Sequence, residues 1–388
     1  MKLMLNLKVA FFATTSNMDS GASWSLLRMI INLHKNGITP IVFLQKHGNI
    51  EEKLNAYNIK YYVIPEYCYD TWIRNIGENI NIKYKCKQLV KKYINFVSYL
   101  KIKKIVKEEK VNLIHLNGLP TFLGAKVAKN SNIKLVWHIR EFMGDDLGLE
   151  FVNNQEAKNL ISESNAIVVV SNAVGRSFNN FVKNPNKIHV VYNGLEVEKY
   201  YKKRKIFSDS NSMTISIIGR LVPQKGQLDL LKAVKYLKDN VKKNTTINII
   251  GASTSYLNVL KKYSKENSLN VNFINYTSHI ETYMQKSDVI CVCSKKEAFG
   301  RVTIEGMLSG ACVVGSRSGG TPELIDDSIN GYLYGPNNLK ELSNILEHIY
   351  TNQLEAQRVA EKGQLFAKNN FTDKKNAQNI LSLYKKIM

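Results

Sequence analysis

The sequence lacks any apolar run that approaches the roughly 18 residues of a membrane-spanning helix, so we do not expect an integral membrane protein. Near its start, Asn6 and Lys8 interrupt the apolar residues, and no small-residue cleavage site follows. This pattern favours a first β-strand over a signal peptide. The cysteines are odd in number and lack disulfide or zinc spacing: Cys68, Cys86, Cys291, Cys293 and Cys312. Such usage predicts a reducing compartment, the cytoplasm.

Two ligand-binding motifs are also missing. No Gly-x-Gly-x-x-Gly occurs, which argues against the dinucleotide fingerprint, and no Asp-x-Asp occurs. Asp145 and Asp146 are adjacent, and we interpret them as loop acids. The sequence therefore contains no metal-binding carboxylate pair of the Asp-x-Asp type.

Acidic residues are scarce relative to basic ones, with 32 Asp and Glu against 54 Lys and Arg, which gives a formal charge of +22. Such a charge permits nucleic acid, an anionic membrane or phosphorylated substrates as partners. No nucleic-acid-binding motif is present, and the basic residues are spread along the chain rather than gathered with stacking aromatics. We therefore do not expect nucleic acid as a partner.

The segment Lys83–Lys110 is strongly basic and is interleaved with aromatic and aliphatic residues such as Leu89, Tyr93 and Phe96. A helix with this composition can lie on an anionic bilayer surface. A helix that packs its apolar face on the protein core and leaves its lysines in water has the same sequence signature. Both interpretations remain open from the sequence.

The length of 388 residues suits two α/β domains. Short β-branched runs alternate with amphipathic segments throughout, and this alternation predicts parallel sheets. The first half has such runs at residues 8–14, 39–45, 61–65, 111–117, 134–142 and 166–171, and the second at 213–219, 247–251, 271–274, 288–293 and 311–315. We place the interdomain linker in the polar, lysine-rich segment 196–212.

The stretch 288–308 predicts a buried strand, a loop and a helix, with Glu297 in the loop and Glu305 one turn into the helix. Eight helical residues span roughly 12 Å, about the length of a sugar diphosphate. Unpaired amides at the helix start suit an anion between the two carboxylates. A surface helix with an ordinary glutamate in its first turn is the alternative for such a pair taken alone.

A second strand end carries two cations, Arg220 after Gly219 and Lys225 before Gly226. Arg can grip two phosphate oxygens, and Lys acts as a point charge, so this loop suits a pyrophosphate. A solvated loop would explain the same residues if they stood alone.

The segment Glu297–Glu305 and the Gly-Arg…Lys-Gly element together resemble the retaining, nucleotide-sugar-dependent glycosyltransferases with the GT-B fold and a Glu-x7-Glu motif. The resemblance implies two Rossmann-like domains, with parallel sheets, facing a central cleft. It implies an acceptor-side domain at residues 1–198, a nucleotide-sugar-binding domain at 199–371, and a terminal helix at 372–388 that crosses back to the first domain.

By this resemblance Glu297 contacts the donor sugar and Glu305 the ribose, while Arg220 and Lys225 bind the diphosphate. The other residues implied in donor binding are Gly251 and Tyr276 near the base, Phe299, Gly300, Arg301 and Val302 at the loop and helix start, and His138 at the donor sugar. On the acceptor side are Arg140 and the Gly21-Ala22 pair, where the family usually has Gly-Gly.

The implied activity is a retaining transfer of a sugar from a nucleotide sugar, a UDP-sugar, to a glycan or lipid-linked acceptor in bacterial surface polysaccharide synthesis. Because Asp-x-Asp is the metal-binding motif of many glycosyltransferases of the other large fold, its absence here predicts metal-independent catalysis with no cofactor. Two alternatives remain open: a non-catalytic basic protein that binds nucleic acid or a membrane surface, and a GT-B nucleotide-sugar epimerase or phosphorylase. The expected location is the cytoplasm, including the inner face of the membrane.

Overall fold

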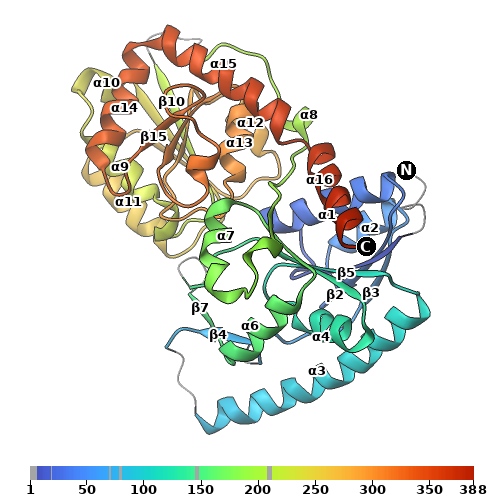
Figure 1. Ribbon diagram of the computed structural model, residues 1–388. Coiled ribbons are helices and arrows are strands. Elements are labelled where there is room, and N and C mark those ends of the chain that lie inside the picture. Colours follow the sequence, from blue (N-terminus) through green and yellow to red (C-terminus); the bar gives the residue numbers. More distant parts are fainter. Residues whose placement is uncertain (1–6, 19, 70, 78–80, 145–147, 208–211) are drawn as a thin grey trace. The chain divides into compact units, whose positions relative to one another are not determined.

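The computed structural model describes residues 7–388 except 19, 70, 78–80, 145–147 and 208–211 (Figure 1). The chain forms two compact units: unit 1, which is Met1–Gly194 with Asp373–Met388, and unit 2, which is Leu195–Thr372. Each unit is built on its own parallel sheet with its own apolar core. The expectation of an α/β fold with parallel sheets is confirmed.

Unit 1 contains a sheet of order β3-β2-β1-β5-β6-β8-β9 whose neighbouring strands are all parallel. Its strands are β1 (Lys8–Phe12), β2 (Thr39–Leu44), β3 (Lys60–Val63), β5 (Leu113–Asn117), β6 (Lys134–Ile139), β8 (Ala166–Val169) and β9 (Ile188–Val190). Its helices are α1 (Gly21–Lys35), α2 (Ile50–Ala56), α3 (Ile82–Glu108), α4 (Phe122–Ser131), α6 (Asn154–Glu163), α7 (Asn172–Phe178) and α16 (Asp373–Ile387). A short antiparallel pair, β4 (Ile73–Asn75) and β7 (Leu149–Phe151), completes it.

Unit 2 contains a parallel sheet of order β12-β11-β10-β13-β14-β15. Its strands are β10 (Met213–Ile218), β11 (Thr245–Ile250), β12 (Val271–Ile274), β13 (Val289–Val292), β14 (Cys312–Ser316) and β15 (Tyr332–Tyr334). Its helices are α8 (Val197–Tyr200), α9 (Gln227–Lys235), α10 (Asp239–Lys243), α11 (Tyr256–Glu266), α12 (Ile280–Met284), α13 (Arg301–Leu308), α14 (Leu339–Thr351) and α15 (Gln353–Asn370).

The central strands are buried on both faces, as their uniform apolar composition requires in a parallel sheet covered by helices. All four residues of β8 and of β13 are buried. Buried Cys291, Cys293 and Cys312 belong to the core of unit 2, where each thiol acts as a small apolar side chain.

The C-terminal helix α16 belongs to unit 1, where it packs beside α1 (Figure 1). Ala377, Ile380, Leu383 and Tyr384 supply its buried face. Asn376 also donates from its side-chain amide to the carbonyl of Tyr192 at 2.7 Å. Tertiary packing of this apolar face holds the end of the chain on unit 1.

The segment 196–212, which we expected to be a linker, is in part an element of unit 2. Its first residues form α8, which contacts α12 and α13. Tyr200, Ile206 and Phe207 are buried within it. Its lysines made the segment polar on average, but a few apolar residues are sufficient to fix it on the unit.

Candidate functional site

Three loops of unit 2 meet at the carboxyl edge of its sheet, because β10, β13 and β14 are adjacent parallel strands. The Lys295 amide donates to the Gln224 carbonyl at 2.9 Å, and the Gly320 amide donates to the Glu297 carbonyl at 2.7 Å. The loop after β13 is therefore held by the loop after β10 and by the loop after β14. This edge is where ligands bind in open α/β sheets.

Glycines make these close backbone contacts possible. A Cβ on Gly226, which has a φ of +71°, would lie 2.1 Å from the Cys293 carbonyl oxygen. A Cβ on Gly319, which has a φ of +59°, would lie 2.3 Å from the Glu297 carbonyl oxygen. Both positions combine a left-handed backbone with contact to a neighbouring loop, so glycine is the residue that fits.

Lys225 and Glu297 form an ion pair with 2.8 Å between Nζ and Oε2. The lysine and glutamate side chains are 34% and 20% exposed, so both remain within reach of a ligand. Lys225 also lies against Gly219, whose Cβ would be 3.7 Å from the lysine side chain. The structure thus brings together a cation and a carboxylate that are 72 residues apart in the chain.

Arg220 stands on the same loop as Lys225 and is exposed. Its carbonyl accepts a hydrogen bond from the buried Gln227 side chain at 3.0 Å, which ties this loop to the first turn of α9. The strand end of β10 therefore presents two cationic residues, as the sequence predicted.

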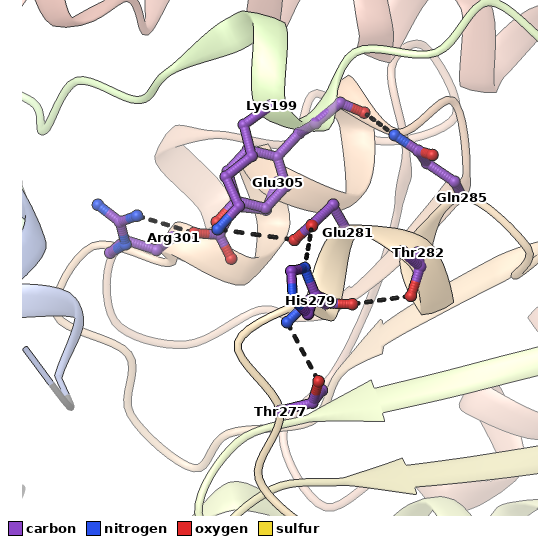
Figure 2. A network of polar contacts seen from close by, with 9 residues as sticks. Lys199, Thr277, His279, Glu281, Thr282, Gln285, Arg301 and Glu305 are labelled. Carbon is purple, nitrogen blue, oxygen red and sulfur yellow. Dashed lines mark hydrogen bonds and ion pairs between the residues drawn. The ribbon is translucent and has the colours of Figure 1, made fainter.

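Glu305 lies one turn into α13, which begins after Gly300 with its φ of +101°. Its Oε1 accepts a hydrogen bond from Arg301 Nη2 at 2.9 Å, and the residue is buried (Figure 2). Burial and the neighbouring Glu305 carboxylate both raise the pKa of Tyr200. Glu305 thus has neighbours that hold its carboxylate in place.

The two other residues implied at this loop differ in exposure. Phe299 is buried, with its ring centroid 6.0 Å from that of Phe371, so its side chain is part of the packing of unit 2. Val302 is half-buried in the first turn of α13.

A polar network beside Glu305 was missed by the sequence reasoning. Glu281 on α12 pairs with Lys199 on α8 at 3.6 Å and with His279 at 3.4 Å (Figure 2). His279 and Glu281 are ordinary surface residue types with no motif around them, and Lys199 is in the segment expected to be a linker. Only the packing of α8 on unit 2 brings these residues together.

Gly251 and Tyr276 follow the neighbouring strands β11 and β12. A Cβ on Gly251 would lie 2.0 Å from the Gly219 carbonyl oxygen, so the end of β11 lies close to the end of β10. Tyr276 is 59% exposed. Both residues are at the same edge of the sheet as the loop of Arg220 and Lys225.

In unit 1, polar residues gather where β5 and β6 end. His138 is opposite Asn117 in the strand register. The Arg140 guanidinium donates to the side-chain oxygens of Asn117 and Asn193, and its Nη2 lies 3.4 Å from His138 Nδ1. Glu141 accepts from the Leu119 amide at 2.7 Å. The contacts of Arg140 with two asparagines were not predicted, because Asn193 is in a different loop.

His138 is fully buried and contacts a second histidine. His115 Nε2 lies 3.2 Å from His138 Nδ1, and His115 Nδ1 lies 2.6 Å from the Tyr384 hydroxyl. Burial, with smaller contributions from Arg140 and, for His138, from His115, lowers the pKa of both histidines, that of His115 to about 3. These side chains are therefore neutral at pH 7.

Acid should destabilise unit 1 through His115. In the unfolded protein, a histidine has a pKa of about 6.5. In the folded protein, His115 faces Arg140, His138 and Tyr384, and its pKa is lowered to about 3. Stability is therefore lost as the pH falls below about 6.5, by up to about 1.4 kcal/mol per pH unit. We expect His115→Asn to melt below the wild type at pH 7, with a gap that narrows by about pH 5. Thermal melting across pH tests this, and a constant gap would contradict it.

The Gly21-Ala22 pair is at the start of α1. The Ser20 side chain accepts from the Ser23 amide at 3.2 Å and caps the helix, as expected for a residue before a first helical turn. Asp145 and Asp146 lie outside the described residues.

Within the described ranges, no three His, Cys, Asp or Glu side chains gather in a metal-binding arrangement. No helix among the described residues is long and apolar enough to span a membrane.

Each of the two α/β units has a parallel sheet, and the C-terminal helix belongs to the first unit. This is the architecture of the GT-B class. Residues 198–366 match the family "Glycosyl transferases group 1", and residues 20–199 match "Glycosyltransferase Family 4". Between them the matches extend over both units, and the chain belongs to these GT-B glycosyltransferases.

Individual proteins agree with this assignment. An uncharacterized glycosyltransferase of Methanocaldococcus jannaschii is 27% identical over 74% of this chain and 78% of its own length. The UDP-Gal:alpha-D-GlcNAc-diphosphoundecaprenol alpha-1,3-galactosyltransferase of Escherichia coli is 21% identical over 65% of this chain and 70% of its own. Anabaena HepE, solved in complex with UDP, superposes with a TM-score of 0.79 at 22% identity, over 98% of this chain and 100% of its own.

Proposed function

We propose that this glycosyltransferase moves a sugar from a UDP-sugar to a glycan or lipid-linked acceptor in bacterial surface polysaccharide synthesis, with retention of the anomeric configuration. The observation that carries the proposal is the Lys225–Glu297 pair at the same sheet edge as Arg220 and the start of α13. The Escherichia coli relative, named as a transferase that uses UDP-Gal and a diphosphoundecaprenol acceptor, supports the substrate classes. The HepE structures with UDP and UDP-glucose support the donor base.

Each residue has a role that its chemistry allows. Breaking the sugar–phosphate bond leaves negative charge on the diphosphate. Lys225, Arg220 and the backbone amides at Gly300 and Arg301 are the groups we assign to that charge. Glu297 is assigned to the hydroxyls of the transferred sugar.

Glu305 is assigned to the ribose hydroxyls, since an ionised carboxylate accepts hydrogen bonds from both. Gly251 and Tyr276 are assigned to the base, with Phe299 and Val302 supporting the loop. In unit 1, His138 is assigned to a sugar oxygen, and Arg140, Gly21 and Ala22 to the acceptor side.

We propose that no metal ion takes part, because cationic side chains are present to stabilise the leaving diphosphate. Retention would follow from attack on the same face as the departing phosphate, whose oxygen takes the proton of the acceptor hydroxyl. The new glycosidic bond then has the configuration of the bond that breaks.

The test is turnover of a panel of nucleotide sugars by the purified protein with a polyprenyl-diphosphate sugar acceptor. We expect UDP release that depends on acceptor, persists in excess chelator, and gives an α-linked product from an α-linked donor by NMR. Release with donor alone and a changed sugar would instead indicate an epimerase. No turnover and no thermal shift with any nucleotide sugar would refute the proposal, because a ligand at a hundred times its Kd adds about 2.7 kcal/mol.

The exposed apolar residues of helix α3 support the proposal that the acceptor is located at a membrane surface. The helix runs along the outside of unit 1, where it packs on α4 (Figure 1). Its buried residues are Asn95, Ser98, Ile102 and Val106. The large apolar residues on its other side are exposed: Ile82, Leu89, Val90, Tyr93, Phe96 and Leu100.

Most of these exposed residues form one stripe, since 89, 93, 96 and 100 recur at helical spacing. The stripe faces away from the residues that pack on unit 1. The sequence also allowed a helix whose apolar face packs on the protein core, but the residues of this stripe do not pack there. Lysines at Lys85, Lys92 and Lys103 beside it complement anionic lipid head groups, each worth about 1 kcal/mol near such a surface.

Replacing Tyr93 and Phe96 together by serine should weaken binding to vesicles that contain anionic phospholipid by at least about tenfold, because each side chain no longer inserts. The matched control replaces Leu354 and Leu365, which are also exposed, by serine and should bind like the wild type. Co-sedimentation measures both. If the Tyr93 and Phe96 double variant bound vesicles as well as the wild type, α3 would be excluded as the membrane contact. If the wild type bound neutral vesicles as well as anionic ones, attraction of the lysines to anionic lipid would be excluded.

A further inference from the structure

Three fully buried side chains from distant parts of unit 1 form a line of hydrogen bonds. The Tyr384 hydroxyl on α16 is 2.6 Å from His115 Nδ1 on β5, and His115 Nε2 is 3.2 Å from His138 Nδ1 on β6. None of the three has exposed surface. The line ends at His138 Nε2, which is buried and has no hydrogen-bond partner among the described residues.

Arg140 gives this line a direction. Its Nη2 is 3.4 Å from His138 Nδ1, and a guanidinium can only donate. His138 Nδ1 must therefore be the bare nitrogen, and the single hydrogen of the neutral ring is on Nε2. In the opposite tautomer, the hydrogen on Nδ1 would point toward an arginine that also donates.

The other two groups follow from this assignment. Because His138 Nδ1 accepts, His115 must donate to it through Nε2–H. His115 Nδ1 is then bare and accepts from the Tyr384 hydroxyl. One arrangement satisfies all the contacts: Tyr384 O–H to His115, His115 N–H to His138, and His138 Nε2–H toward a partner that the chain does not supply.

A buried N–H without an acceptor costs about 1–3 kcal/mol, and an oxygen from a ligand would remove that cost. We propose that Tyr384 and His115 are positioning residues, which hold His138 as an Nε2–H donor to a hydroxyl oxygen of the sugar substrate. This proposal deepens the role assigned to His138 and rests on the proposed function. It also gives the terminal helix α16 a part in activity, because α16 carries the hydroxyl that starts the line.

The first test needs no substrate. In protein labelled with ¹⁵N-histidine, correlation of ring nitrogens with ring protons distinguishes a protonated nitrogen from a bare one. We expect His115 and His138 to be neutral, with hydrogen on Nε2, at about pH 7 and at about pH 5, where an unperturbed histidine is charged. Hydrogen on Nδ1 of His138, or a charged ring, would overturn the proposal whether or not the protein transfers sugar.

The second test removes only the hydroxyl. Tyr384→Phe should leave both tautomers in place, because Arg140 still faces the bare Nδ1 of His138. It should shift the ¹⁵N resonance of His115 Nδ1, which loses its hydrogen-bond donor, and it should lower kcat/KM by roughly tenfold, which corresponds to about 1.4 kcal/mol. Tyr62→Phe is the matched control, since it removes the hydroxyl of a half-buried tyrosine that donates to Glu109 elsewhere in unit 1, and it should change neither readout.

The outcomes separate the two ideas. A fall in activity with an unchanged His115 Nδ1 resonance would reduce Tyr384 to a packing residue and refute its positioning role. Expected tautomers in a wild-type protein that turns over no nucleotide sugar would leave the hydrogen-bond line in place and refute the proposed function.

Discussion

Glu297→Ala should lower turnover of the donor by at least about a hundredfold without unfolding the protein. A group that contacts the reacting sugar contributes about 3–4 kcal/mol when its interaction strengthens in the transition state. The loss of stability should be small, because the ion pair with Lys225 is partly exposed and such pairs contribute only about 0–1 kcal/mol. Lys225→Ala should have a similar effect on turnover, since it removes charge at the diphosphate.

Initial rates with a saturating acceptor, together with thermal melting, measure both effects. The matched control is Lys238→Ala, which breaks another lysine–glutamate pair of unit 2, with Glu347, away from the three loops. We also expect Asp146→Ala to leave turnover unchanged. Wild-type rates in Glu297→Ala or Lys225→Ala would remove these residues from the site, whereas equal losses in Lys238→Ala would point to a general effect of charge.

Glu305→Gln should weaken the binding of UDP by about tenfold to a hundredfold. A hydrogen bond to a charged group is worth about 1.5–3 kcal/mol, and the amide keeps the size of the side chain but loses the charge that two ribose hydroxyls would share. Glutamine also retains an oxygen for Arg301, which donates to Glu305 at 2.9 Å in the wild type. The packing of α13 should therefore survive the change.

Calorimetric titration with UDP gives the affinity of each variant. Glu281→Gln is the closest control, since Glu281 belongs to the adjoining network with Lys199 and His279 (Figure 2) but has no assigned contact with the nucleotide. We expect UDP to bind Glu281→Gln as it binds the wild type. If Glu305→Gln also bound UDP normally, the ribose assignment would be wrong.

The strand–loop–helix at 288–308 shows which features a local sequence pattern can predict. A continuous β-branched run predicted β13, the apolar period after Gly300 predicted α13, and the structure confirms both. These features depend on neighbouring residues, so the sequence contains them. The same reasoning failed at 196–212, where average polarity hid the apolar residues that pack on unit 2.

The sequence also left the nature of α3 open. An amphipathic pattern shows that a helix has an apolar face, but it does not show what that face contacts. The structure decides that the stripe with Tyr93 and Phe96 is exposed, because α3 packs on unit 1 through Asn95, Ser98 and other residues on a different side.

By itself, the sequence determined the alternation of strands and helices, the two α/β units, and which acids and cations stand at strand ends, because each follows from local order and residue type. The tertiary structure alone decided that Lys225 pairs with Glu297, that Arg140 is held by two asparagines, and that Tyr384 reaches His115. The residues of that last contact are 269 positions apart. Such pairs form only when the sheets and helices have packed, since no local pattern specifies which distant side chains will share a buried hydrogen bond.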